Sequence, residues 1–84
     1  MTDKRLKNRI KVHRAMHDWT QEELARRVNV TRKTINTVEN GKYIPSAYLA
    51  LKIARAFGVS VEELFQIDDD GIGDKTGPIE PKGR

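Results

Sequence analysis

The chain of 84 residues contains no cysteine and no long apolar run. The absence of cysteine excludes disulfide bonds and zinc sites built on thiolates. The two histidines, His13 and His17, could share a helix face, but a metal site would need further ligands, so we expect neither a metal nor another cofactor. No apolar run approaches the roughly 20 residues needed to cross a bilayer, and the basic N-terminus lacks the apolar stretch of a signal peptide. We therefore expect a soluble cytoplasmic protein that does not contact a membrane.

The charge is distributed unevenly, although the net charge is only +4. Residues 1–42 carry 11 Lys and Arg against 5 Asp and Glu, a balance of +6, whereas residues 43–84 carry 5 against 7, a balance of −2. A basic half suits a polyanionic partner such as nucleic acid. Ordinary scatter of solvated charges would be the preferred explanation if that half held no recognition motif.

Residues 20–41 have the pattern of two short helices joined by a tight turn. Thr20 and Glu23 have the spacing of a capping box, which begins the first helix. Thr31 is suited to cap the second helix, and Gly41 is suited to end it because glycine tolerates a left-handed backbone.

Both short helices carry an apolar stripe at helical spacing, formed by Leu24, Ala25 and Val28 on the first and by Ile35 and Val38 on the second. Helices this short are unstable alone, so they must bury these stripes against each other and a third element. The turn between them holds Asn29, a residue type that accepts a positive φ. The exposed side of the second helix carries polar side chains. This is the layout of a helix-turn-helix whose second helix enters the major groove of DNA.

The rest of the chain extends this pattern to an all-α domain of five helices. We expect helices at about residues 6–17, 21–28, 32–40, 47–57 and 61–65, joined by short connections. Ser46 and a second capping box, Ser60 with Glu63, begin the last two helices. From Asp68 the sequence is acidic and contains many glycines and prolines, which predicts a flexible tail over 68–84 after a compact domain over 1–67.

Two residues near this motif have alternative interpretations. His13 falls where the first helix needs an aliphatic residue, so it lies either half-buried in the core or at its rim, and the spacing favours the core. Trp19 directly precedes the Thr20 cap, where a hydrophobic residue packs on the first turn as a staple, while stacking on a base is the alternative.

The second helix should read bases from its N-terminal half, because that end points into the groove. The candidates for base contacts are Arg32, Lys33, Asn36 and Thr37. Arg and Lys pair with guanine O6 and N7, and Asn pairs with adenine N6 and N7. The candidates for phosphate contacts are Gln21, Thr31, Thr34, Asn40, Lys42 and Tyr43, although Tyr43 could instead lie in the core.

Three charged residues support this assignment. Two adjacent cations at a helix start, Arg32 and Lys33, oppose the helix dipole, so a polyanionic partner explains them better than solubility does. Glu39 is the one acid on the same helix and would repel phosphate. We therefore expect Glu39 to face inward and to form a structural ion pair with Arg14 of the first helix.

The run TQEELARRVNVTRKTINTVENGKY resembles the helix-turn-helix of the lambda-repressor-like family, also called the Cro-type or xenobiotic-response-element (XRE) family. The following run, IPSAYLALKIARAFGVSVEELF, is similar to the small stand-alone regulators of that family. The resemblance implies a compact five-helix lambda-repressor-like DNA-binding domain that regulates transcription, usually as a homodimer. Two positions depart from the family pattern: Asn29 replaces the usual turn glycine, and His13 replaces an aliphatic residue.

The resemblance also implies particular residue roles. It implies phosphate contacts through Gln21 and Asn40, base contacts through Arg32, Lys33 and often Thr37, and an inner ion pair between Arg14 and Glu39. In some compact members a segment after the fifth helix forms a strand that pairs with the N-terminal residues, and residues 65–67 correspond to that segment.

These observations favour a sequence-specific regulator, with a repressor as the first hypothesis, that binds double-stranded DNA as a homodimer on a palindromic operator. The expected dimer interface is the fifth helix and the end of the fourth, with Leu64 and Phe65. The alternative is an antitoxin or interaction module that binds a small protein partner and regulates its own operon, a hypothesis suggested by the acidic tail. No pattern of a nucleophile with a base, a metal site or a phosphate-binding glycine loop is present, so we expect no enzymatic activity.

Overall fold

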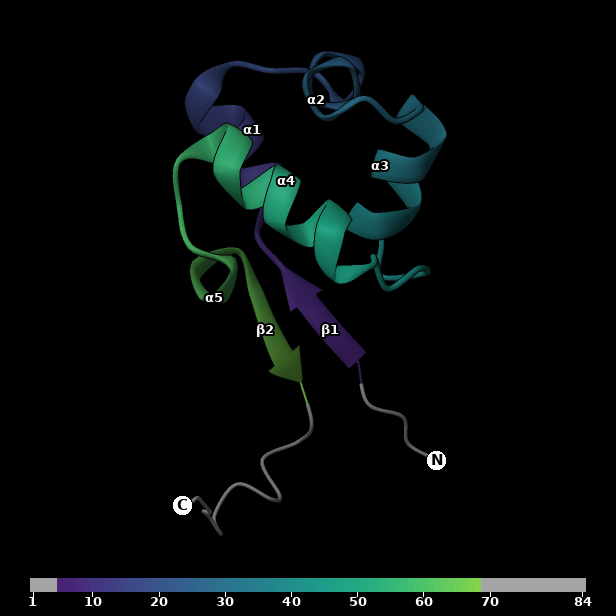
Figure 1. Cartoon of the computed structure of the whole chain (residues 1–84), viewed down its shortest axis with the longest axis vertical. Coiled ribbons are helices and arrows are strands. Elements are labelled where there is room, and N and C mark those ends of the chain that lie inside the picture. Colours follow the sequence, from purple (N-terminus) through teal and green to yellow (C-terminus); the bar gives the residue numbers. More distant parts are fainter. Residues whose placement is uncertain (1–4, 69–84) are drawn as a thin grey trace, which may run out of the picture.

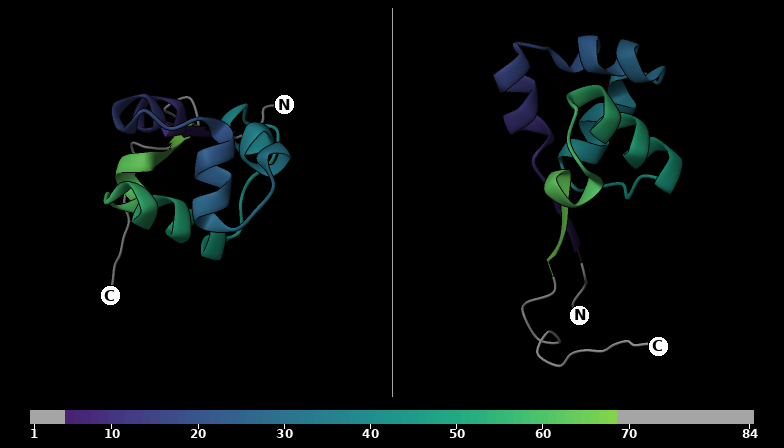
Figure 2. Two further views of the ribbon diagram at one scale, coloured as in Figure 1. Left: turned by 90° about the horizontal axis from the view of Figure 1, so that it is seen from above. Right: turned by 60° about the vertical axis from the view of Figure 1, so that its left-hand side comes forward.

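The computed structural model describes residues 5–68, so the expected tail over 68–84 lies outside the described residues except for Asp68, which belongs to a strand. The elements follow in the order β1 (Arg5–Asn8), α1 (Ile10–His17), α2 (Gln21–Val28), α3 (Arg32–Glu39), α4 (Ala47–Phe57), α5 (Val61–Leu64) and β2 (Phe65–Asp68). The five helices form one body, from which the strand pair projects (Figures 1 and 2). Within these residues, no helix is both long and apolar enough to span a membrane.

The two strands form an antiparallel sheet in which Leu6 is paired with Ile67 and Asn8 with Phe65. The strand pair that the family resemblance implied is therefore present. The expected start of the first helix near Leu6 is wrong, because residues 5–8 belong to β1 and α1 begins only at Ile10. The Asn8 side chain marks the change of structure, since its Oδ1 accepts a hydrogen bond from the Ile10 N–H at 3.0 Å.

The end of the chain's helical part also differs from expectation. The fifth helix ends at Leu64, one residue earlier than expected, and Phe65 begins β2. The capping box at its start is complete: the Ser60 hydroxyl accepts from the Glu63 N–H, and the Glu63 carboxylate accepts from the Ser60 N–H, both at 3.1 Å. At the start of α2 only half of the expected box forms, because Thr20 accepts from the Glu23 N–H at 3.0 Å while the Glu23 carboxylate turns to Arg26 and Arg27.

The core contains the apolar stripes of α2 and α3 together with residues of the other helices and of β2. Its members are Ile10, Leu24, Ala25, Val28, Ile35, Val38, Leu49, Ile53, Ala54, Phe57, Leu64 and Phe65. Because α2 contacts both α3 and α4, the two short helices bury their stripes against each other and against a third element. This packing fixes the orientation of α3, whose opposite side remains outside.

One corner of the body is aromatic. The Trp19 ring stacks on Phe57 with centroids 5.4 Å apart, and the guanidinium carbon of Arg27 lies 4.2 Å from the centroid of the indole ring. His13 is half-buried, with its ring centroid 5.4 Å from that of Phe57. Trp19 and His13 thus both pack against the helical body, the arrangement that the sequence favoured for each.

The turn between α2 and α3 depends on Asn29, whose φ is 60°. An alanine in this conformation is strained, whereas a glycine is not. We expect Asn29→Ala to lower the free energy of unfolding by about 1 kcal/mol, and Asn29→Gly to be the more stable of the two variants. Urea unfolding followed by circular dichroism measures both values.

Asn40 provides the matched control because it also follows a helix and is exposed, but its φ is −85°. There the order should be reversed, with Asn40→Ala more stable than Asn40→Gly. If the alanine variant were the more stable one at Asn29 as well as at Asn40, the backbone at Asn29 would not be strained by a side chain.

Candidate nucleic-acid interface

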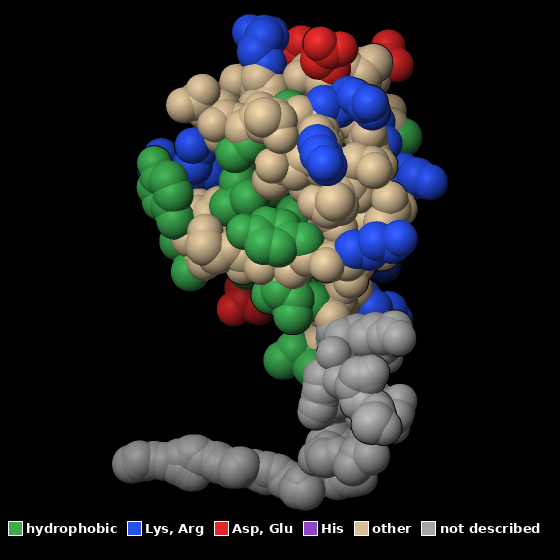
Figure 3. Space-filling view, turned by 90° about the vertical axis from the view of Figure 1, so that its right-hand side faces the viewer, with side chains coloured by type: hydrophobic (Ala, Val, Ile, Leu, Met, Phe, Trp, Pro, Cys, Tyr) green, Lys and Arg blue, Asp and Glu red, His purple; other side chains and the backbone are tan. Residues whose placement is uncertain are grey.

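α3 has one buried and one exposed side. Ile35 and Val38 point into the core, while Arg32 and Lys33 are exposed and Asn36 is half-buried. Figure 3 shows Lys and Arg side chains gathered over the upper and right-hand parts of the face that carries α3, with a band of hydrophobic side chains beside them. The structure therefore brings the residues expected to contact bases together on one side of a single helix.

Glu39 turns away from this exposed side and forms an ion pair with Arg14 of α1. The Arg14 Nε lies 2.6 Å from Oε2 of Glu39, and a second guanidinium nitrogen lies 3.2 Å from Oε1. The two side chains are 16% and 4% exposed, respectively. A third donor of Arg14 reaches the Trp19 carbonyl oxygen at 3.0 Å, so this one side chain joins α1, the α1–α2 connection and α3.

Gln21, the first residue of α2, connects this ion pair to the exposed side of α3. Its Nε2 donates to Oε1 of Glu39 at 3.1 Å and to Oδ1 of Asn36 at 3.2 Å. Its Oε1 accepts from Arg32 at 3.3 Å. Asn40 donates from Nδ2 to the same Oδ1 of Asn36 at 3.2 Å. Both N–H groups of the Gln21 amide are thus engaged within the protein, and its backbone N–H at the helix start remains the group suited to a phosphate.

The three threonines of the site direct their hydroxyls to neighbouring groups of α3. Thr31 caps the helix by accepting from the Thr34 N–H at 3.2 Å, and the two hydroxyl oxygens lie 3.0 Å apart. The Thr37 hydroxyl donates to the carbonyl oxygens of Thr34 and Lys33 at 2.9 and 3.1 Å. The Thr37 hydroxyl hydrogen is therefore used within the helix, whereas the Thr31 hydroxyl serves as an acceptor for the cap.

Beyond α3, the expected phosphate contacts Asn40, Lys42 and Tyr43 are all exposed. Tyr43 therefore does not lie in the core, which was its alternative position. The chain turns here because Gly41 has a φ of 73° and the Lys42 N–H bonds to the Thr37 carbonyl at 3.0 Å. This turn carries Lys42 and Tyr43 back beside the end of α3.

Two features of the site did not emerge from the sequence. The Asn8 amide donates to the carbonyl oxygens of Val38 and Glu39 at 3.1 and 3.3 Å, and so ties the last turn of α3 to β1. The Glu23 carboxylate binds Arg26 and Arg27, both at 2.6 Å, and the hydrogen bond from Arg26 is the main reason that the pKa of Glu23 lies below its ordinary value. The sequence did contain a signal for each feature. Asn8 stands shortly before a helix, where asparagine side chains often bond to the backbone, and Glu23 stands three and four residues before two arginines, the spacing of ion pairs on a helix.

Leu64 and Phe65, the residues expected in the dimer interface, are both buried within the single chain. The two residues are only 0% and 7% exposed, because the turn from α5 into β2 directs both side chains into the core. Large exposed hydrophobic residues lie elsewhere, and they include Ile44 in the loop before α4 and Tyr48 and Leu51 on α4.

Comparisons with known proteins agree with this geometry. The sequence profile of the helix-turn-helix family matches residues 10–64. An uncharacterized HTH-type transcriptional regulator of Methanocaldococcus jannaschii is 51% identical over 65 residues, covering 77% of this chain and 98% of the relative. A second such regulator, from Archaeoglobus fulgidus, is 49% identical over 70 residues, covering 83% and 99%. Among solved structures, the SOS-response transcriptional repressor LexA from Eubacterium rectale has a TM-score of 0.62 and 28% identity, covering 89% of this chain and 78% of that one.

The ion pair yields a stability prediction. Arg14→Met leaves the buried Glu39 carboxylate without its cation, and we expect the free energy of unfolding to fall by about 3–5 kcal/mol. The double variant Arg14→Met with Glu39→Met should recover much of this loss, because it leaves no buried charge. Urea unfolding measures all variants, and a single variant that fails to fold counts as the large loss.

Arg26→Met is the matched control. Arg26 also lies 2.6 Å from a carboxylate, but its side chain is 70% exposed, so its removal should cost less than about 1 kcal/mol. Equal losses for Arg14→Met and Arg26→Met would contradict the role assigned to burial.

Proposed function

Since the chain belongs to the XRE-type helix-turn-helix family of transcription regulators, we propose that it represses transcription as a homodimer on a palindromic operator, with α3 in the major groove. The observation that carries this proposal is the exposed side of α3, where Arg32, Lys33 and Asn36 lie together while Glu39 is turned inward. Similarity to the repressor LexA supports repression over activation.

The contacts divide into two groups. Arg32, Lys33, Asn36 and Thr37 read base edges, because they occupy the first two turns of the helix that enters the groove. The groups around both ends of the motif bind phosphates: the N-terminus of α2 at Gln21, and Thr31, Thr34, Asn40, Lys42 and Tyr43. The first group determines the sequence, and the second fixes the position of the protein on the duplex.

A single recognition helix reads only a few base pairs, so specificity requires a second copy. Two recognition helices about 34 Å apart would meet successive major grooves on one side of the duplex and read both halves of a palindrome. We place the dimer interface on the exposed side of α4 and the following segment, in place of the buried Leu64 and Phe65.

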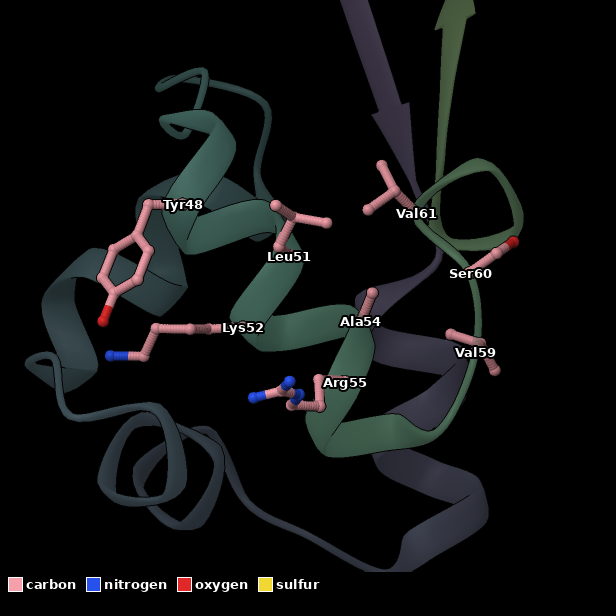
Figure 4. A pocket seen from close by; sticks show the side chains of 8 residues that line it. All are labelled: Tyr48, Leu51, Lys52, Ala54, Arg55, Val59, Ser60 and Val61. Atoms are coloured by element: carbon pink, nitrogen blue, oxygen red, sulfur yellow. The ribbon is translucent and has the colours of Figure 1, made fainter.

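The proposed interface includes two large apolar side chains of α4, Tyr48 and Leu51, which are 71% and 59% exposed. With Val59 and Val61 they line a hollow of about 420 Å³, in which Leu51 and Val61 lie across from each other (Figure 4). Exposed apolar surface of this kind marks interaction sites. The same surface carries cations on α4, among them Arg55, whereas α5 carries the acids Glu62 and Glu63. A twofold arrangement with α4 against the partner's α5 therefore pairs opposite charges.

DNA binding is tested by its dependence on salt. A dimer with about six or more phosphate contacts should lose about a thousandfold in affinity for duplex DNA between 50 and 200 mM salt. Selection of bound duplexes from a random pool provides the operator, and fluorescence anisotropy with that operator measures the affinity. Salt-independent binding, or no binding to any duplex, would contradict the proposed function.

Two variants separate base reading from phosphate binding in the same titration. Arg32→Ala should relax specificity at one base pair in each half-site, whereas Lys42→Ala should weaken all sequences alike and reduce the salt slope. Arg32 would be a phosphate contact if its removal weakened every sequence equally.

The dimer interface is tested with Leu51→Glu. This change places a charge in the proposed interface while leaving the core intact, so the variant should sediment as a monomer at micromolar concentration and lose at least about a hundredfold in operator affinity. The wild-type chain should sediment as a dimer.

Val12→Glu is the control, because Val12 on α1 is 50% exposed and lies outside the proposed interface. It should leave the dimer and the operator affinity unchanged. A monomeric wild type, a dimeric Leu51→Glu variant or a stoichiometric complex with a different small protein in place of the dimer would refute the interface.

A further inference from the structure

The innermost group in the hydrogen-bond network of the site is the Glu39 carboxylate, which can only accept hydrogen bonds. The Glu39 carboxylate is 4% exposed and is held by Arg14, so it is a fixed anion at the inner end of the network. Any amide that contacts it must present its NH₂ group. The orientation of the neighbouring amide is therefore determined by chemistry and not by chance.

Gln21 is that amide, and its orientation is fixed from both ends. Its Nε2 lies 3.1 Å from Oε1 of Glu39, which only accepts, and its Oε1 lies 3.3 Å from a nitrogen of Arg32, which only donates. Rotating the amide by 180° would place an N–H group against a guanidinium and a carbonyl oxygen against a carboxylate. The remaining N–H group of Gln21 must then donate to Asn36.

Asn36 receives this donor on its carbonyl oxygen. Oδ1 of Asn36 accepts from Gln21 at 3.2 Å and from Asn40 at 3.2 Å, which occupies both of its lone pairs. The Asn36 Nδ2 has no hydrogen-bond acceptor among residues 5–68. The amide therefore offers only N–H donors beyond the protein.

We propose that Glu39 and Gln21 are positioning residues that fix the Asn36 amide as a donor, and that Asn36 consequently selects guanine and rejects adenine. This inference rests on the proposed function. In the major groove guanine offers two adjacent acceptors, O6 and N7, whereas bidentate pairing of asparagine with adenine requires a free carbonyl oxygen as well as an N–H. Asn36 can pair with adenine in that way only if it turns over and gives up its bonds to Gln21 and Asn40.

This inference revises the expectation from the sequence, where the residue type alone suggested adenine. It also assigns Gln21 a role other than a side-chain contact to phosphate. A phosphate accepts hydrogen bonds only, and both N–H groups of the Gln21 amide are already donated inside the protein.

The test selects bound duplexes from a random pool with the full chain and with three variants. Asn36→Ala identifies the base pair that Asn36 reads, as the position where selection is lost. At that position the wild type should prefer guanine over adenine by roughly tenfold. Gln21→Met removes the amide at similar volume, and it should reduce this preference to about threefold or less while the other positions of the half-site keep theirs.

Gln66→Met is the matched control, because Gln66 lies in β2, where its amide donates to the carbonyl oxygens of Glu62 and Glu63. It should leave the guanine preference unchanged. A merely structural role for Gln21 would lower the thermal midpoint and weaken all sequences without moving the preference at one position.

The outcomes separate this inference from the proposed function. Failure of the wild-type chain to select any sequence overturns both. Selection of adenine at the Asn36 position, a preference unaffected by Gln21→Met, or no position lost in Asn36→Ala overturns the inference and leaves DNA binding intact.

Discussion

The carboxylate of Glu39 is the point at which the fold and the recognition surface meet. It lies at the end of α3, and Arg14 of α1 and Gln21 of α2 both donate to it. The backbone carbonyl of the same residue accepts from Asn8 of β1. Three elements, α1, α2 and β1, therefore fix the last turn of α3. These short helices have little packing surface, and they hold a defined orientation because the buried carboxylate needs hydrogen-bond donors from several of them. Such an arrangement provides specificity of structure more than net stability.

Local signals in the sequence predicted the middle of the fold well. Caps such as Thr31 and Ser60 and the spacing of apolar residues located α2 to α5 to within a residue, because these features act within one or two turns. The start of α1 was placed too early because Leu6 and Ile10 have helical spacing. What makes Leu6 extended is its pairing with Ile67, a contact between the two ends of the domain that no local pattern contains.

The candidate site was predictable to a similar extent. Glu39 was informative because an acid on the proposed recognition helix would repel phosphate unless it turned inward, and Arg14 is the cation it contacts. The direction of each amide was not predictable, since it depends on which lone pairs of Asn36 are occupied in three dimensions. Spacing also could not decide which apolar residues are covered: Leu64 and Phe65 fill the core, while Leu51 remains outside.

The strand pair has a consequence for the architecture of longer proteins. The antiparallel register places the backbone of residue 5 opposite that of residue 68, so the chain enters and leaves the domain at neighbouring points. These points lie at the opposite end of the molecule from α2 (Figure 1). A domain with adjacent ends can be inserted into a loop of another protein, or carry a fused domain on either side, without rearranging its interior. The domain, with the proposed DNA-binding surface on α3, could then be transferred between proteins as a unit.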